Sequence, residues 1–118
     1  MSTFASVTLG NNNNAATSTT SWIPLDPNIH PFAVSFAVVL GSANDNFAFS
    51  VQHTLHPILS SANGPTDAVA FDHSTVSGKS ANIDGNYAFP IAGIRLLSVS
   101  GSGTSPRATF LVRQAGIV

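Results

Sequence analysis

The sequence contains no cysteine and no glutamate, and only 8% of its 118 residues carry a formal charge. The lack of cysteine excludes disulfides and zinc sites built on thiolates. The net charge of −1 gives no electrostatic footprint for nucleic acid or for an anionic membrane. The few carboxylates are scattered aspartates beside turn-forming residues, which argues against hydrolysis by paired carboxylates.

Long apolar runs and targeting signals are also missing. No segment approaches the roughly 18 consecutive apolar residues of a membrane-spanning helix. The first ten residues have neither the basic start nor the apolar stretch of a secretory signal. We therefore expect no membrane partner.

What the sequence does contain favours strands. Hydrophobic residues make up 43% of the chain, whereas good surface helix formers are nearly absent, with one lysine and two glutamines. From Phe32 to Leu40 large and small side chains alternate, and the same alternation runs from Phe47 to Leu55. Period 2 of this kind indicates half-buried strands. Because a loop dense in turn residues separates the two runs, we expect them to form one long antiparallel hairpin.

The C-terminal third repeats this pattern. Ile94 to Ser100 reads as a strand, the Gly/Ser-rich stretch after it turns the chain, and Arg107 to Gln114 returns. Four shorter segments are further strand candidates: Thr3 to Leu9, Thr19 to Ile23, Ala68 to Phe71 and Asn86 to Phe89. The fold class expected is all-β, an antiparallel sandwich or jelly-roll-like barrel of six to eight strands in one domain over residues 1–118.

One polar, low-complexity segment interrupts the candidate strands. Residues 10–21 hold the run Asn11, Asn12, Asn13 and Asn14, followed by alanine, serine and threonine. This segment is either an ordinary surface loop or an arm that orders on a partner. We take the four asparagines as candidate partner contacts.

The histidines raise the question of a metal site. His53 and His56 are three residues apart and point to opposite faces of a strand, so they converge on one ion only if the chain turns between them. A site made of His53, His73 and Asp72 needs a fold that the sequence does not reveal. We expect hydrogen-bonded or exposed histidines, with no metal and no cofactor.

No catalytic motif stands out. Asp72-His73 resembles the base and orienter of a triad, but adjacent residues rarely orient each other in that way. There is no Gly-x-Ser-x-Gly elbow, and Gly101-Ser102-Gly103 lacks the third glycine and following helix of a phosphate loop. The sequence therefore predicts a protein that is not an enzyme.

Two further side chains suggest contacts. Trp22 is the only tryptophan, and it is either a core residue at a strand end or an exposed anchor or sugar platform. Arg95 lies inside an apolar strand, which indicates an edge, an interface or a cross-sheet pair with Asp72 or Asp84. Trp22, Asp72, His73 and Arg95 join the asparagines as candidate partner contacts.

Several segments between Phe47 and Gly116 resemble a family of small virion proteins from tailed bacteriophages and prophages. The likeness rests on Asn86-Tyr87-Ala88-Phe89-Pro90, on Ala92-Gly93-Ile94-Arg95-Leu96 and on the final strand ending in Gln114. Phe49 to Leu55 and Phe71-Asp72-His73 also match patches of that family. The sequence departs from the family at His56-Pro57 and at Ala70.

The resemblance implies a capsid decoration (cement) protein. Such a protein is made in the host bacterial cytoplasm, sits on the outer surface of the capsid and stabilises the shell by bridging subunits of the major capsid protein. It is expected to be a homo-oligomer, a dimer or a trimer, that binds no nucleic acid. The alternative is a receptor- or glycan-binding module of a head fibre, neck or tail, which needs exposed aromatic and amide groups in a groove.

Overall fold

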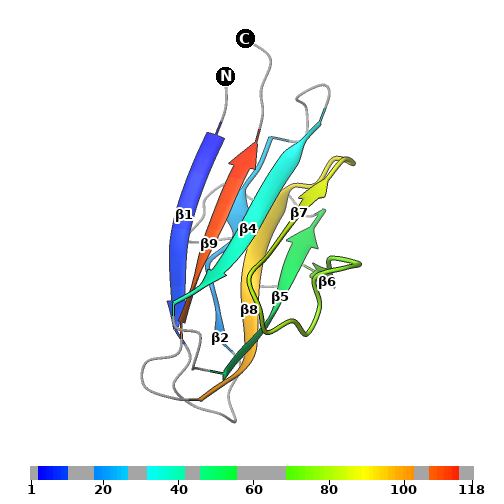
Figure 1. Cartoon of the computed structure of the whole chain (residues 1–118). Helices are drawn as coiled ribbons and strands as arrows, with labels where there is room; N and C mark the ends of the chain where they lie inside the picture. Colours follow the sequence, from blue (N-terminus) through cyan, green and yellow to red (C-terminus); the bar gives the residue numbers. More distant parts are fainter. Residues whose placement is uncertain are drawn as a thin grey trace.

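The computed structural model describes residues 3–10, 18–26, 32–41, 46–55, 69–102 and 107–114. Over these residues the chain forms nine strands and no helix (Figure 1). The strands are β1 (Thr3–Gly10), β2 (Ser18–Thr19), β3 (Ile23–Pro24), β4 (Val34–Leu40), β5 (Asn46–Thr54), β6 (Phe71–Asp72), β7 (Ile83–Tyr87), β8 (Gly93–Ser102) and β9 (Arg107–Gln114).

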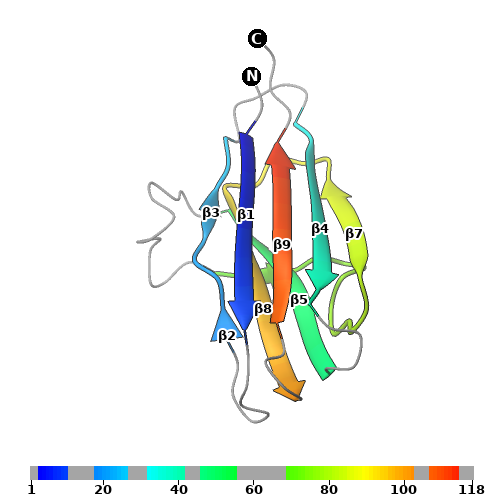
Figure 2. The same cartoon turned by 60° about the vertical axis from the view of Figure 1, so that its left-hand side comes forward.

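The strands form two sheets that pack face to face (Figures 1 and 2). The first, sheet A, has the order β1-β9-β4-β7. The second, sheet B, has the order β2-β8-β5-β6, and β3 pairs with β8 further along the edge that β2 occupies. Every pairing between these strands is antiparallel, so the expected all-β antiparallel sandwich is confirmed.

The connectivity is that of a jelly roll. If β2 and β3 are counted as one interrupted strand, the strands pair from the outside of the chain inwards: β1 with β9, β2 and β3 with β8, β4 with β7, and β5 with β6. The pairings of β9 with β4 and of β8 with β5 then close the two sheets. This order is the double-sheet arrangement in which two Greek keys share one core.

The prediction that residues 32–55 form one antiparallel hairpin is wrong. β4 lies in sheet A and β5 in sheet B, and β8 and β9 are divided between the sheets in the same way. The alternation in these segments shows that each strand buries one face. It does not show whether the next strand of the chain lies beside it in the same sheet or opposite it in the facing sheet, because the buried face is the same in both cases. In a jelly roll the loops carry the chain across the sandwich, which spans about 10 Å.

The faces of the strands are those that the alternation predicts. In β4 the buried side chains are Val34, Phe36 and Val38, and in β9 they are Ala108, Phe110 and Val112. Phe47, Phe49 and Val51 of β5 and Ile94 and Leu96 of β8 complete the centre of the core from sheet B. The inner faces of both sheets therefore bury one continuous apolar cluster.

Candidate functional site

Two edge strands border the same open side of the sandwich. β7 ends sheet A and β6 ends sheet B, and both lie on one side of the molecule (Figure 1). His53 of β5 lies on the inward face of its strand near this side, in register with Phe71 of β6. Its Nδ1 lies 2.8 Å from the hydroxyl of Tyr87 in β7, which joins the two sheets by a hydrogen bond.

The ring of Tyr87 is the centre of this open side. Tyr87 is only 1% exposed. The rings of His53 and His73 both meet it edge-on, with centroids at 4.9 and 4.8 Å, and the ring of Phe89 does the same at 5.5 Å. Such T-shaped contacts between rings are favourable and directional, so they fix the position of each ring.

His73 links the end of β6 to the backbone of β7. Its Nε2 donates to the carbonyl oxygen of Asn86 at 2.9 Å, because a carbonyl can only accept. Its Nδ1 accepts from the backbone N–H of Thr75 at 3.2 Å. The two bonds together require the neutral tautomer with the proton on Nε2.

Burial changes the pKa values of this cluster. Burial, and next the neighbouring His73, lower the pKa of His53, while Asp72 opposes them. Burial, with a smaller contribution from Asp72, raises the pKa of Tyr87 well above its usual value of 10. At neutral pH the pair is therefore an uncharged imidazole and an uncharged phenol.

An exposed apolar rim surrounds this cluster. Four side chains in the segments of this cluster expose more than half of their surface: Leu55 63%, Val69 51%, Phe71 52% and Phe89 53%, where Leu55 is two residues after His53 and Val69 two residues before Phe71. Phe71 stacks on His53 at 5.9 Å, and Phe89 meets the same ring edge-on at 5.7 Å. We call the cluster and its rim the aromatic edge; its members are Leu55, Val69, Phe71, Phe89, His53, His73 and Tyr87.

A row of polar contacts runs across sheet B beside the aromatic edge. The Nε of Arg95 donates to the Oε1 of Gln52 at 2.9 Å, and the Nε2 of Gln52 donates to the Oδ1 of Asp72 at 2.9 Å. The hydroxyl of Ser77 donates to the second carboxylate oxygen of Asp72 at 2.8 Å. Arg95 and Asp72 are thus connected indirectly through Gln52, which lies between them in the register, instead of by the direct pair that was one of the three alternatives for Arg95.

Trp22 ends this row on its far side. The guanidinium of Arg95 lies 4.4 Å from the centre of the Trp22 ring, and the ring is only 7% exposed. Burial lowers the pKa of Arg95 below its usual value. Since Trp22 is buried beneath a cation, it does not form an exposed platform on which a sugar could stack.

The candidate contact residues therefore fall into two groups. Asp72, Arg95 and Trp22 are connected through Gln52, whereas His73 lies in the aromatic edge. Asn11, Asn12, Asn13 and Asn14 lie outside the described residues, as does His56. Sequence reasoning did not foresee Tyr87 as the residue on which both histidines converge, because a pairing across the sandwich leaves no local pattern.

The structure also bears on chemistry and on membranes. Over the described residues, no group of three or more metal-ligating side chains comes together. Within the same ranges there is no helix with the length and hydropathy of a membrane span. His53, His73 and Asp72 do lie at one edge, but their hydrogen bonds run to Tyr87, Asn86, Thr75, Gln52 and Ser77.

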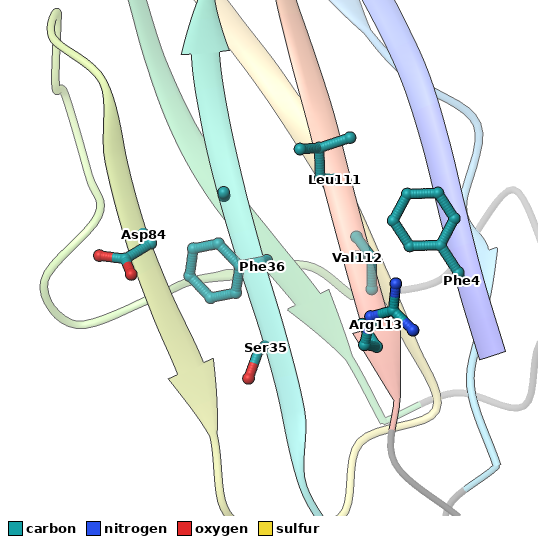
Figure 3. A pocket seen from close by; sticks show the side chains of 8 residues that line it. Phe4, Ser35, Phe36, Asp84, Leu111, Val112 and Arg113 are labelled. Carbon is teal, nitrogen blue, oxygen red and sulfur yellow. The ribbon is translucent and has the colours of Figure 1, made fainter. Parts of the chain in front are cut away.

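A shallow groove lies on the outer face of sheet A, the face away from the core. It has a volume of about 300 Å³. Figure 3 shows Phe4 and Arg113 on one side of it, Asp84 on the other, and Ser35 of β4 between them. The guanidinium of Arg113 lies 4.9 Å from the centre of the Phe4 ring. The groove is open and has one cationic and one anionic border.

Comparisons with known proteins give no family. No family model and no curated protein matches the sequence. Among solved structures, a chain from Bacillus endospore appendages, described as disulfide-linked pili, is similar over 100% of this chain and 88% of that one, at 8% identity and a TM-score of 0.45.

Two further structures are similar over most of this chain. A chain of infectious bursal disease virus, Gx strain, is matched over 98% of this chain and 32% of its own length, at 13% identity and a TM-score of 0.42. EvdO2 from Micromonospora carbonacea var. aurantiaca is matched over 98% of this chain and 52% of its own length, at 12% identity and a TM-score of 0.43. This chain thus spans about a third of the viral chain and half of EvdO2. Likenesses at these scores carry no argument about function.

Proposed function

We propose that this protein is a capsid decoration protein that attaches to the outer shell of a bacteriophage and stabilises it. The observation that carries the proposal is the aromatic edge, where Leu55, Val69, Phe71 and Phe89 are each more than half exposed around buried polar groups. Contiguous exposed apolar side chains with a polar rim are typical of protein-binding surfaces. The resemblance of Phe71-Asp72-His73 and of the segment around Tyr87 to phage virion proteins lies in the same edge.

The surface chemistry is consistent with attachment to a shell. Apolar anchors give affinity, while the carboxylate of Asp72, whose oxygens can accept further hydrogen bonds, lies next to them and can set the orientation of the partner. The chain has only four basic residues against five acidic ones, so binding does not depend on a strong charge field. On a shell with many identical sites, modest single contacts add up to stable coverage.

The first test is the copy number of the protein in purified particles of the phage that carries the gene, measured by quantitative mass spectrometry. Hundreds of copies per particle, together with loss of heat resistance when the gene is deleted, are the expected result. A dozen copies or fewer would overturn the decoration role and indicate a neck, tail or fibre part. Absence from particles would overturn the virion assignment altogether.

A second test addresses the surface. Particles that lack the protein are mixed with purified wild type or with Phe71→Ser and Phe89→Ser variants, and bound protein is measured after sedimentation. Each variant should weaken attachment at least tenfold while its thermal unfolding shows a folded sandwich. Lys79→Ser is the matched control, since Lys79 is exposed on the segment between β6 and β7 but adds no apolar surface. Attachment that survives both phenylalanine changes would assign binding to another surface.

A further inference from the structure

The outer face of sheet A is a second, separate surface. No described element lies over β1, β9, β4 and β7 in the view of Figure 2. Phe4 is 55% exposed and Val39 is 40% exposed on this face, Leu111 of β9 is half-buried on it, and the outward residues of β4 beside Leu111 are the small Ser35 and Ala37. A flat face with a low centre lets another flat surface approach closely.

Two opposite charges of this face lie on either side of β4, while a third, Arg107, is exposed at the far end of β9. Arg113 is paired with Ser35 in the register, and Asp84 is paired with Ala37. From a strand spacing of about 4.8 Å and a rise of about 3.4 Å per residue, their Cα atoms are roughly 12 Å apart. The midpoint between the two residues falls on β4, between Ser35 and Ala37.

This pattern is complementary to itself. We propose that two copies of the chain pack face to face through the outer faces of sheet A, around a two-fold axis that lies in the plane of the interface, crosses β4 between Ser35 and Ala37, and runs at right angles to the line from Arg113 to Asp84. Such an axis places Arg113 of each copy against Asp84 of the other, because it exchanges the two positions. In a two-fold interface every contact occurs twice, so one type of ion pair is formed at two places.

The size of the face suits a reversible dimer. Four strands of five to eight residues cover roughly 450 Å² per copy, or roughly 900 Å² in total, which is in the range of weak, transient interfaces. Phe4 adds the apolar contact. Its ring stacks on the guanidinium of Arg113, so the same two-fold rotation that places Arg113 against Asp84 also places Phe4 near β7 of the partner copy. We expect a dissociation constant in the micromolar range, which rises with salt because the pairs lie near solvent.

The test uses charge reversal in trans, with mass measured by sedimentation equilibrium over a range of concentrations. Wild type should be a dimer at high concentration. Arg113→Asp alone and Asp84→Arg alone should each raise the dissociation constant at least tenfold, since each creates two like-charge contacts. An equimolar mixture of the two variants should recover a dimer, because both contacts in the mixed pair join opposite charges. Lys79→Asp, a reversal away from this face, should dimerise like wild type.

Each result decides the proposal. A wild-type chain that stays monomeric at hundreds of micromolar, forms a trimer, or dimerises equally well with either reversal would overturn it. Failure of the mixture to recover the dimer, with both variants folded by circular dichroism, would also overturn it. The result is independent of shell attachment, because the aromatic edge and this face lie on different sides of β7 and each is changed by its own substitutions.

Discussion

The hydroxyl of Tyr87 and the Nδ1 of His53 lie 2.8 Å apart and join the two sheets of the sandwich at its open side. The contact links β7, the last strand of sheet A, to β5 in the interior of sheet B. This side-chain bond crosses from one sheet to the other, whereas the backbones of both residues pair within their own sheets. The bond therefore depends on the whole jelly roll being closed, and it reports on that closure.

Tyr87→Phe should destabilise the protein by about 1–2 kcal/mol. The ring and its aromatic contacts remain, but the nitrogen of His53 loses its partner at a partly buried site. The free energy of unfolding from urea titration measures the effect. A loss below about 0.3 kcal/mol would show that water replaces the hydroxyl at no cost.

Acid should weaken the fold through His53. Its pKa in the folded protein lies below the ordinary value of 6.5, so the unfolded chain takes up a proton first as pH falls. The stability is complete above pH 6.5 and declines as pH drops towards the lowered pKa of the folded state. Asp72, His73 and Tyr87 are the titratable groups around this ring. Melting temperatures from pH 7.5 to 5 should show the decline, and His53→Gln should flatten it.

Gly85→Ala should destabilise the sandwich by about 1–3 kcal/mol. A Cβ at this position would lie 2.7 Å from the ring of Phe36, so the ring must move out of a packed core. The double variant Gly85→Ala with Phe36→Leu should recover part of this loss, because the smaller side chain leaves room.

Gly78→Ala is the matched control for that rescue. Gly78 has a φ of +64° and nothing within 4 Å of an added Cβ, so its alanine variant is strained by backbone conformation alone, at a cost of about 1 kcal/mol. Phe36→Leu should give this variant no rescue. Equal rescue of both glycine variants, measured by chemical denaturation, would rule out the clash with Phe36 as the cause.

Arg95→Ala should uncover Trp22. The guanidinium covers the ring at 4.4 Å, and its removal should shift the tryptophan emission to longer wavelength and increase quenching by acrylamide. The accompanying loss of stability should be about 1 kcal/mol. Because Trp22 is the only tryptophan, the signal is unambiguous, and Lys79→Ala should leave it unchanged. Quenching that does not differ from wild type would mean that other groups shield the ring.

Much of the candidate site was visible in the sequence only as separate residues. Asp72, His73, Arg95 and Trp22 stood out because charges, histidines and tryptophan are rare in this chain. The sequence did not show that these residues are grouped. Gln52, which connects Arg95 to Asp72, is an ordinary strand residue in the sequence, and only the pairing of β5 with β8 and β6 gives it this place. Tyr87 and Phe89 lie in the strand candidate Asn86 to Phe89, and only the tertiary structure shows that one is buried and the other exposed.

The sequence by itself determined where the long strands lie and which face of each is buried, as in β4, β5, β8 and β9. This information is local, since alternate side chains of a strand point to opposite faces whatever its neighbours are. Only the tertiary structure decided which strands share a sheet. One physical reason explains why the hairpin between β4 and β5 was wrongly predicted and why the meeting of His53, His73 and Tyr87 was not foreseen. Pairing between distant strands depends on how the whole chain closes around its core, and that choice leaves no periodic mark on either strand.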